Sequence, residues 1–125
     1  MASLLIVDDD KDGREVLCRY LESKGHRVDC VSNGKEALGS VIGQTPDLVI
    51  LDLFMPEVDG GGFLEVVRSY LRLQSLPVVV LTGLPDSPAV DRARFLKVNA
   101  ILIKGKVTLD EIHTTIEQEL HRAPK

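Results

Sequence analysis

The sequence predicts one α/β domain built on a doubly wound parallel sheet of five strands and five helices. Strand-like and helix-like segments alternate five times along the 125 residues, which is the pattern of a sheet whose strands are joined by helices. Residues 48–51 form an unbroken apolar run, which indicates a central strand covered on both faces. With 44% hydrophobic residues the chain can bury one core, and its length is too short for two domains.

Three strands and two helices are predicted in the first half of the chain. The strands are 4–7, 27–31 and 48–51, and the second is expected at an edge because charged and apolar residues alternate along it. A helix over 11–23 begins with acidic residues, stops at Gly25 and buries one face, formed by Val16, Leu17, Tyr20 and Leu21. A second helix over 35–42 ends at Gly43 and buries Ala37, Leu38, Val41 and Ile42.

The second half supplies two more strands, 77–81 and 100–103, and three helices. A helix over 61–72 is expected to share one apolar face among Phe63, Val66, Val67, Tyr70 and Leu71. The helix over 87–97 is expected to be short or mobile, because prolines bracket its start and its apolar stripe is thin. Thr108 and Glu111 form a capping box for the last helix, whose buried side carries Leu109, Ile112, Ile116 and Leu120.

Composition excludes several classes of protein. The formal charge is −4 and no basic stripe is visible, which argues against a nucleic-acid surface and suits a soluble cytoplasmic protein. No apolar run approaches the roughly 20 residues of a membrane span, and no secretory signal precedes the first strand. Cys18 and Cys30 form no CxxC pair, so two reduced thiols in a reducing compartment are expected, with a disulfide left open.

Polar residues stand where four of the strands end. Asp8 and Asp9 follow the first strand, Asp52 the third, Thr82 the fourth and Lys104 the fifth. Taken singly, each residue is explained as a turn cap or a surface charge. Because the carboxyl ends of parallel strands meet at one edge, the carboxylates should converge, and such carboxylates are held together by a divalent cation. Mg²⁺ suits an open site with few carboxylates better than Ca²⁺ does.

Four segments, LLIVDDD, LDLFMPEVDG, VVVLTG and ILIKG, together resemble the receiver domain of two-component response regulators, the CheY-like superfamily. The resemblance runs from Leu4 to about Arg122 and implies a single receiver domain over 1–125. It implies a flavodoxin-like fold with strand order 2-1-3-4-5. It also implies a signalling switch, which catalyses its own phosphorylation and dephosphorylation but is no enzyme for an external substrate.

The resemblance also implies roles for the strand-end residues. Asp52 would accept a phosphoryl group from a sensor histidine kinase or a phosphotransfer protein. Asp8, Asp9, Asp52 and the backbone carbonyl of Phe54 would bind Mg²⁺. The side chains that contact the phosphoryl group would be Thr82 and Lys104.

The partners implied by the family are a downstream protein or an output domain, reached through the last two helices and the fifth strand. The sequence leaves open whether the chain stands alone and whether phosphorylation dimerises it.

Two departures from the family pattern, at positions 101 and 105, affect the expected switch, and a further pair of positions affects the expected lifetime of the phosphoryl group. An aromatic residue is common three positions before the lysine, where Ile101 stands, so ring burial cannot be the readout. Gly105 replaces the usual proline after the lysine, which predicts a trans Lys104–Gly105 bond because a cis bond without proline costs about 3 kcal/mol. Phe54 and Leu84, which flank the path of hydrolytic water in the family, are apolar, and a slowly decaying phosphoryl group is expected.

Rival functions follow from the same fold or from the same nucleophile. A flavin-binding protein would need a phosphate loop after the first strand, where three aspartates stand instead. An aspartyl phosphatase would want a second acid at the position of Phe54. A receiver-like interaction module that is not phosphorylated is the remaining alternative. The histidines at 26, 113 and 121 are expected to be exposed or capping residues, not metal ligands.

Overall fold

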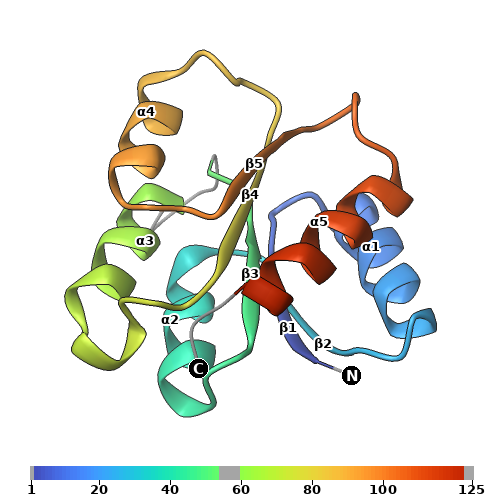
Figure 1. Cartoon of the computed structure of the whole chain (residues 1–125), viewed down its shortest axis with the longest axis horizontal. Coiled ribbons are helices and arrows are strands. Elements are labelled where there is room, and N and C mark those ends of the chain that lie inside the picture. The colour runs from blue at the N-terminus through green and yellow to red at the C-terminus, as the bar shows by residue number, and fades with distance from the viewer. Residues whose placement is uncertain (1, 54–59, 123–125) are drawn as a thin grey trace.

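The computed structural model describes residues 2–53 and 60–122. Its centre is a five-stranded parallel sheet with strand order β2-β1-β3-β4-β5, as predicted (Figure 1). The strands are β1 (Ser3–Val7), β2 (Arg27–Val31), β3 (Leu48–Leu51), β4 (Val78–Thr82) and β5 (Ala100–Ile103). Every residue of β3 and β4 is buried, whereas β2 and β5 at the two edges are only partly covered. The apolar run that predicted a central strand is therefore the middle of the sheet.

Helices cover both faces of the sheet (Figure 1). On one face lie α1 (Lys11–Ser23) and α5 (Leu109–Arg122); on the other lie α2 (Gly34–Gly43), α3 (Gly60–Ser69) and α4 (Pro88–Phe95). A short 3₁₀ helix, Leu71–Leu73, follows α3. Because strand side chains alternate between faces, the core divides into two clusters, one under each helix layer. No helix among the described residues is long and apolar enough to cross a membrane.

The predicted capping box of the last helix and the predicted stop at Gly25 are both present. Thr108 and Glu111 form the expected capping box, in which the Glu111 N–H donates to the Thr108 hydroxyl oxygen at 3.0 Å and the Thr108 N–H donates to the Glu111 carboxylate at 2.9 Å. The side chain of Asn33 caps α2 by accepting from the Glu36 N–H at 2.8 Å. After α1 the chain turns through Gly25, whose φ of 92° favours glycine.

Some residues predicted to be buried are exposed. Val16 on α1 and Ile42 on α2 are 54% and 47% exposed, because each lies at the border of its helix's buried stripe. The predicted helix over 61–72 ends at Ser69, and Tyr70 has an extended backbone. That break turns Leu71 outward, to 86% exposure, and places Leu73 in the core instead.

Two further features bear on stability and chemistry. Arg68 donates to the backbone carbonyls of Leu76 and Leu96, both at 2.9 Å, and so ties α3 to the end of α4, which is short as predicted. Burial lowers the pKa of Arg68. Cys18 and Cys30 are free thiols, and burial, together with the neighbouring Cys18, raises the pKa of Cys30 to about 12. Cys30 is therefore a packed thiol and a poor nucleophile.

Candidate functional site

Asp8 and Asp52 lie side by side at the carboxyl edge of the sheet. The strands end at this edge in the upper part of Figure 1. β1 and β3 are hydrogen-bonded neighbours in which Val7 pairs with Leu51, so the residues that follow them emerge at the same level. The Asp52 N–H donates to the Val7 carbonyl at 2.9 Å, which fixes the backbone of the nucleophile candidate. Both carboxylic residues are only 6% exposed. Their burial follows from position: each directly succeeds a strand whose neighbours cover it.

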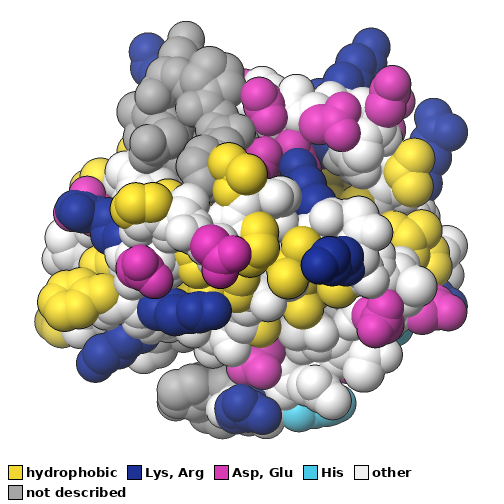
Figure 2. Space-filling view, turned by 90° about the horizontal axis from the view of Figure 1, so that it is seen from above, with side chains coloured by type: hydrophobic (Ala, Val, Ile, Leu, Met, Phe, Trp, Pro, Cys, Tyr) yellow, Lys and Arg dark blue, Asp and Glu magenta, His cyan; other side chains and the backbone are white. Residues whose placement is uncertain are grey.

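Asp9 completes a group of three carboxylates. Asp8, Asp9 and Asp52 each have a carboxylate oxygen that lies within 4.8 Å of an oxygen of the other two residues. Asp8 is oriented by the Asp10 N–H, which donates to its Oδ1 at 2.9 Å, while Arg14 donates to its backbone carbonyl at 2.7 Å. Figure 2 looks onto this edge, where acidic side chains gather beside basic ones. The predicted convergence of the acids is what the structure has.

Lys104 reaches this group from β5, two strands away from Asp52. Its Nζ lies 2.9 Å from Oδ2 of Asp8 and 3.4 Å from Oδ2 of Asp52. Burial alone would lower the pKa of Lys104, but the hydrogen bond with Asp8 and the charge of Asp52 outweigh it and raise that pKa. The lysine is thus held charged, and one ammonium faces three carboxylates, which leaves two unbalanced negative charges among these four groups.

A divalent cation fits the residues at this edge. Mg²⁺ binds oxygen ligands at about 2.0–2.1 Å, so two ligand atoms on one ion are at most about 4.2 Å apart. The carboxylate oxygens of Asp8, Asp9 and Asp52 that face one another lie within 4.8 Å, which is on the scale of that separation. Two excess negative charges are what a divalent ion balances. The carbonyl of Phe54, the fourth predicted ligand, lies outside the described residues.

Thr82 ends β4 and is fully buried. Its hydroxyl oxygen accepts a hydrogen bond from the Leu84 N–H at 3.1 Å, and its carbonyl accepts one from the Lys104 N–H at 2.8 Å. These bonds set the end of β4 and the start of the next loop relative to β5. Leu84 is 58% exposed, so it lies at the rim of this edge.

The loop after Lys104 is built around glycine. The described residues contain no cis peptide bond, so the predicted trans Lys104–Gly105 linkage is confirmed. Gly105 has φ 84°, in the left-handed region that proline, with φ near −65°, cannot adopt. Glycine in place of the family's usual proline therefore gives residue 105 a left-handed backbone conformation.

A groove of about 460 Å³ opens beside the carboxylates and runs between α1 and α5. Asp8 and Lys104 lie at its polar end, and Val16, Leu17 and Ile112 are among the apolar residues that line it. The exposure of Val16, which the helical pattern had assigned to the core, is explained by this groove.

The prediction that the histidines are exposed or capping residues is confirmed for His121, which is exposed, and is wrong for His26. His26 is only 9% exposed and lies within 3.2 Å of His113, a residue 87 positions away in the sequence. Glu117 completes this cluster. Nothing in the local sequence pattern joins a turn residue to a particular face of α5, so only the folded structure brings them together.

Comparison with known proteins decides the family. The sequence model of the response regulator receiver domain matches residues 4–117. The chain belongs to that family. The receiver domain has 47% identity over 82 residues with the response regulator Rre1 of Synechocystis, and 36% over 104 residues with the transcriptional regulatory protein GltR of Pseudomonas aeruginosa. These matches cover 65% and 83% of the chain but only 36% and 42% of the two relatives.

A solved structure of similar sequence shows the same architecture. The signal receiver domain of a signal transduction histidine kinase from Syntrophus aciditrophicus superposes with a TM-score of 0.88 at 29% identity, covering 98% of this chain and 92% of that one. The similar receiver domains thus belong to a response regulator, a transcriptional regulatory protein and a histidine kinase. The fold and the family that the strand-end motifs predicted are both confirmed.

Proposed function

We propose that this receiver domain takes a phosphoryl group onto Asp52 in a Mg²⁺-dependent reaction and passes the signal on by a conformational change. The observation that carries the proposal is the meeting of Asp52 with Asp8, Asp9 and Lys104 at one edge of the sheet. A carboxylate in that setting is a nucleophile for phosphorus, and the cationic groups around it offset the charge of the incoming oxygens.

The chemistry assigned to this chain is a single transfer. One oxygen of Asp52 forms a bond to phosphorus while the bond from phosphorus to the donor's histidine nitrogen breaks, and the electron pair of that bond returns to the imidazole. Phosphoryl transfer passes through a loose transition state, so the protein contributes mainly position and charge. Lys104, held charged by Asp8 and Asp52, would move its ammonium to a phosphoryl oxygen.

Asp8, Asp9 and Asp52 would hold Mg²⁺, and Phe54 would add its carbonyl, as the family pattern implies. The ion supplies neutralisation of the phosphoryl oxygens when bound. Asp8 is prepared for this by the Asp10 N–H, which fixes one of its oxygens.

Thr82 is the switch residue of this proposal. Its hydroxyl now accepts from the Leu84 N–H, and the same hydroxyl can donate its hydrogen to a phosphoryl oxygen once Asp52 is modified. Turning toward the phosphoryl group would loosen the bond to Leu84 and with it the loop before α4. Signalling then proceeds without an aromatic ring, since position 101 is isoleucine.

The partner proposed as donor is a histidine kinase or a phosphotransfer protein. The groove between α1 and α5 reaches Asp8 and Lys104 and has apolar walls, so it offers a donor protein a contact surface beside the nucleophile. The output partner or domain is proposed to contact α4, β5 and α5.

The test compares the wild type with Asp52→Asn after treatment with a small phosphodonor and Mg²⁺. Intact mass should rise by one phosphoryl group in the wild type only, and chelation of Mg²⁺ should abolish the rise. Asp12→Asn, at an exposed acid of the first turn of α1, is the matched control and should behave as the wild type. Equal phosphorylation of Asp52→Asn would overturn the assignment, and a wild type that gains no mass would favour the unphosphorylated interaction module.

A further inference from the structure

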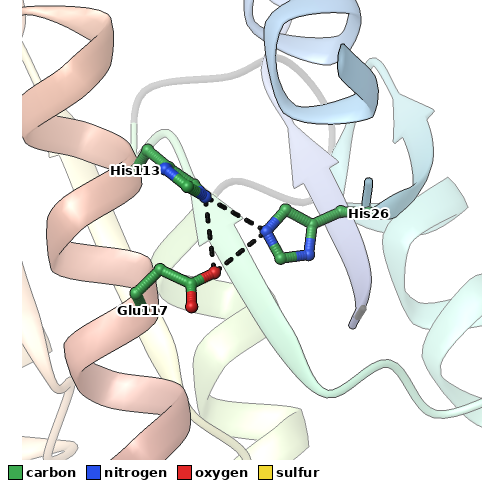
Figure 3. A group of neighbouring side chains, drawn as sticks. All are labelled: His26, His113 and Glu117. Atoms are coloured by element: carbon green, nitrogen blue, oxygen red, sulfur yellow. Dashed lines mark hydrogen bonds and ion pairs between the residues drawn. The ribbon is translucent and has the colours of Figure 1, made fainter. Parts of the chain in front are cut away.

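Two histidines and a glutamate meet on the side of the domain away from the carboxylate edge. His26 lies in the turn before β2, while His113 and Glu117 lie one turn apart on α5 (Figure 3). Nε2 of His26 is 3.2 Å from Nε2 of His113 and 3.0 Å from Oε1 of Glu117, and the third side of this triangle measures 3.3 Å. None of the three residues takes part in the proposed phosphoryl chemistry.

The triangle matches the spacing of ligands on a tetrahedral zinc ion. Zinc binds histidine nitrogen and carboxylate oxygen at about 2.0–2.1 Å, which separates two ligand atoms by about 3.3 Å. The observed separations of 3.0–3.3 Å agree with that value on all three sides. An ion lying just off the plane of the three atoms would contact all of them with little side-chain movement.

The donor set selects the ion. Two imidazole nitrogens and one carboxylate suit Zn²⁺, whereas Mg²⁺ and Ca²⁺ prefer oxygen alone. Without an ion, the two facing Nε2 atoms hydrogen-bond to each other only when one ring donates its hydrogen and the other accepts it. A cation takes a lone pair from each ring and satisfies both.

The surroundings favour entry and fix the ligands. The side chain of Glu117 is 40% exposed, that of His113 23% and that of His26 5%, so one side of the triangle is open to water for a fourth ligand. The ring of Tyr20 packs edge-on against His113, and the Tyr20 hydroxyl donates to Asp110 on the same helix. These contacts hold His113 in the orientation seen.

One hydrogen bond must be given up. Nδ1 of His26 accepts from the Ala2 N–H at 3.1 Å, so without metal the ring carries its proton on Nε2 and donates it to Glu117. Binding through Nε2 moves that proton to Nδ1 and releases the Ala2 amide. The loss is one neutral hydrogen bond near the start of β1. The change at the Ala2 amide can therefore be used to detect metal binding through His26.

We propose that His26, His113 and Glu117 form a Zn²⁺ site that cross-links α5 to the turn between α1 and β2. The site is separate from the Mg²⁺-type carboxylate edge and would stabilise the docked position of α5, because an ion that binds only the folded arrangement favours it. This chain would then respond to a transition metal through α5 and to phosphorylation through Asp52.

The experiment is a calorimetric titration of the whole chain with ZnCl₂ in excess Mg²⁺, which occupies the carboxylate edge. Cys18→Ser/Cys30→Ser serves as the parent protein, so that the thiols cannot bind the ion. One zinc ion per chain is expected, and His113→Gln and Glu117→Gln should each weaken binding about tenfold or more. His121→Gln, at an exposed histidine on the same helix, is the matched control and should bind as the parent.

Two measurements keep the outcome decisive. His26 is largely buried, so His26→Gln is read only if its circular dichroism matches the parent. Independently, the Ala2 amide resonance of the parent should shift when zinc is added and should stay in place in His113→Gln. Affinity that is unchanged in His113→Gln, or lost in His121→Gln or Asp52→Asn instead, would overturn the site. Weakening in His113→Gln with an unmoved Ala2 amide would also contradict it, because His26 would not be a ligand.

Discussion

The carboxylate edge and the histidine cluster are both groups of three potential metal ligands, yet they are assembled in different ways. At the carboxylate edge, Asp8 and Asp52 directly follow neighbouring strands, so sheet hydrogen bonding alone brings them together. At the cluster, His26 comes from a turn and His113 and Glu117 from α5, so side-chain packing between separate elements sets the geometry. One arrangement is fixed by the backbone, and the other depends on how a helix docks.

The two groups also differ in charge. Lys104 lies among the carboxylates and balances only one of three negative charges, whereas the cluster pairs one carboxylate with two imidazoles. Hard, oxygen-bound Mg²⁺ suits the first and borderline Zn²⁺ the second. A single small domain can therefore keep two cations apart by ligand type.

The largest effect is expected from Lys104→Met. Removal of the ammonium leaves the phosphoryl oxygens without their lysine partner, and losing one such preorganised group slows reactions by about 100-fold or more. The initial rate of mass gain with a small phosphodonor measures this loss. Lys106→Met, an exposed neighbour, should react at the wild-type rate. Zinc affinity at the cluster should stay unchanged in both variants, and a fall there would show that the two regions are coupled.

A crossed pair of variants sharpens the contrast in ligand type. Asp9→Asn, at an exposed acid of the edge, should weaken Mg²⁺ binding about tenfold and leave Zn²⁺ binding intact, because an amide oxygen is a neutral and weaker ligand. Glu117→Gln should do the reverse. Calorimetric titrations of both variants with both ions give the four affinities. If either variant lowered both affinities alike, the cause would be loss of structure and not loss of a ligand.

The same contrast explains how far sequence reasoning reached. Asp8, Asp52, Thr82 and Lys104 could be predicted because each stands at or directly after the end of a buried strand, and strand ends of a parallel sheet share an edge. The contacts of His26 could not be predicted, because they depend on which face of α5 packs inward and on the shape of the turn before β2.

The errors in burial have the same physical origin. Helical periodicity indicates which side of a helix faces the core, but it does not show how far the neighbouring elements cover that side. Val16 was therefore predicted to be buried, although it faces a groove. Leu71 was assigned to a helix face although the chain leaves the helix at Tyr70. The site residues on strands were free of this ambiguity, since β3 and β4 are covered on both faces.

A smaller effect is expected from Gly105→Ala, which tests the backbone beside Lys104. A Cβ at Gly105 would meet no atom within 4 Å, so the whole cost comes from holding alanine at φ 84°, about 1 kcal/mol. Gly39→Ala is the matched control, because Gly39 lies in α2 with equal space around it and alanine there should stabilise by up to about 1 kcal/mol. Denaturant unfolding of the two variants should give shifts of opposite sign; equal shifts would mean that the loop has relaxed to another conformation.

The smallest effect concerns pH. Because the pKa of Lys104 is raised in the folded protein, its ion pairs with Asp8 and Asp52 add stability that is complete below the unfolded pKa of about 10.4. That contribution is lost as the pH rises through the higher, folded pKa. The difference in unfolding free energy between the wild type and Lys104→Met, measured without divalent ions, should therefore be constant to about pH 10 and shrink above it. Lys106→Met should show no such change relative to the wild type, because its side chain is exposed. A difference that stays constant well above pH 10 would contradict the raised pKa of Lys104.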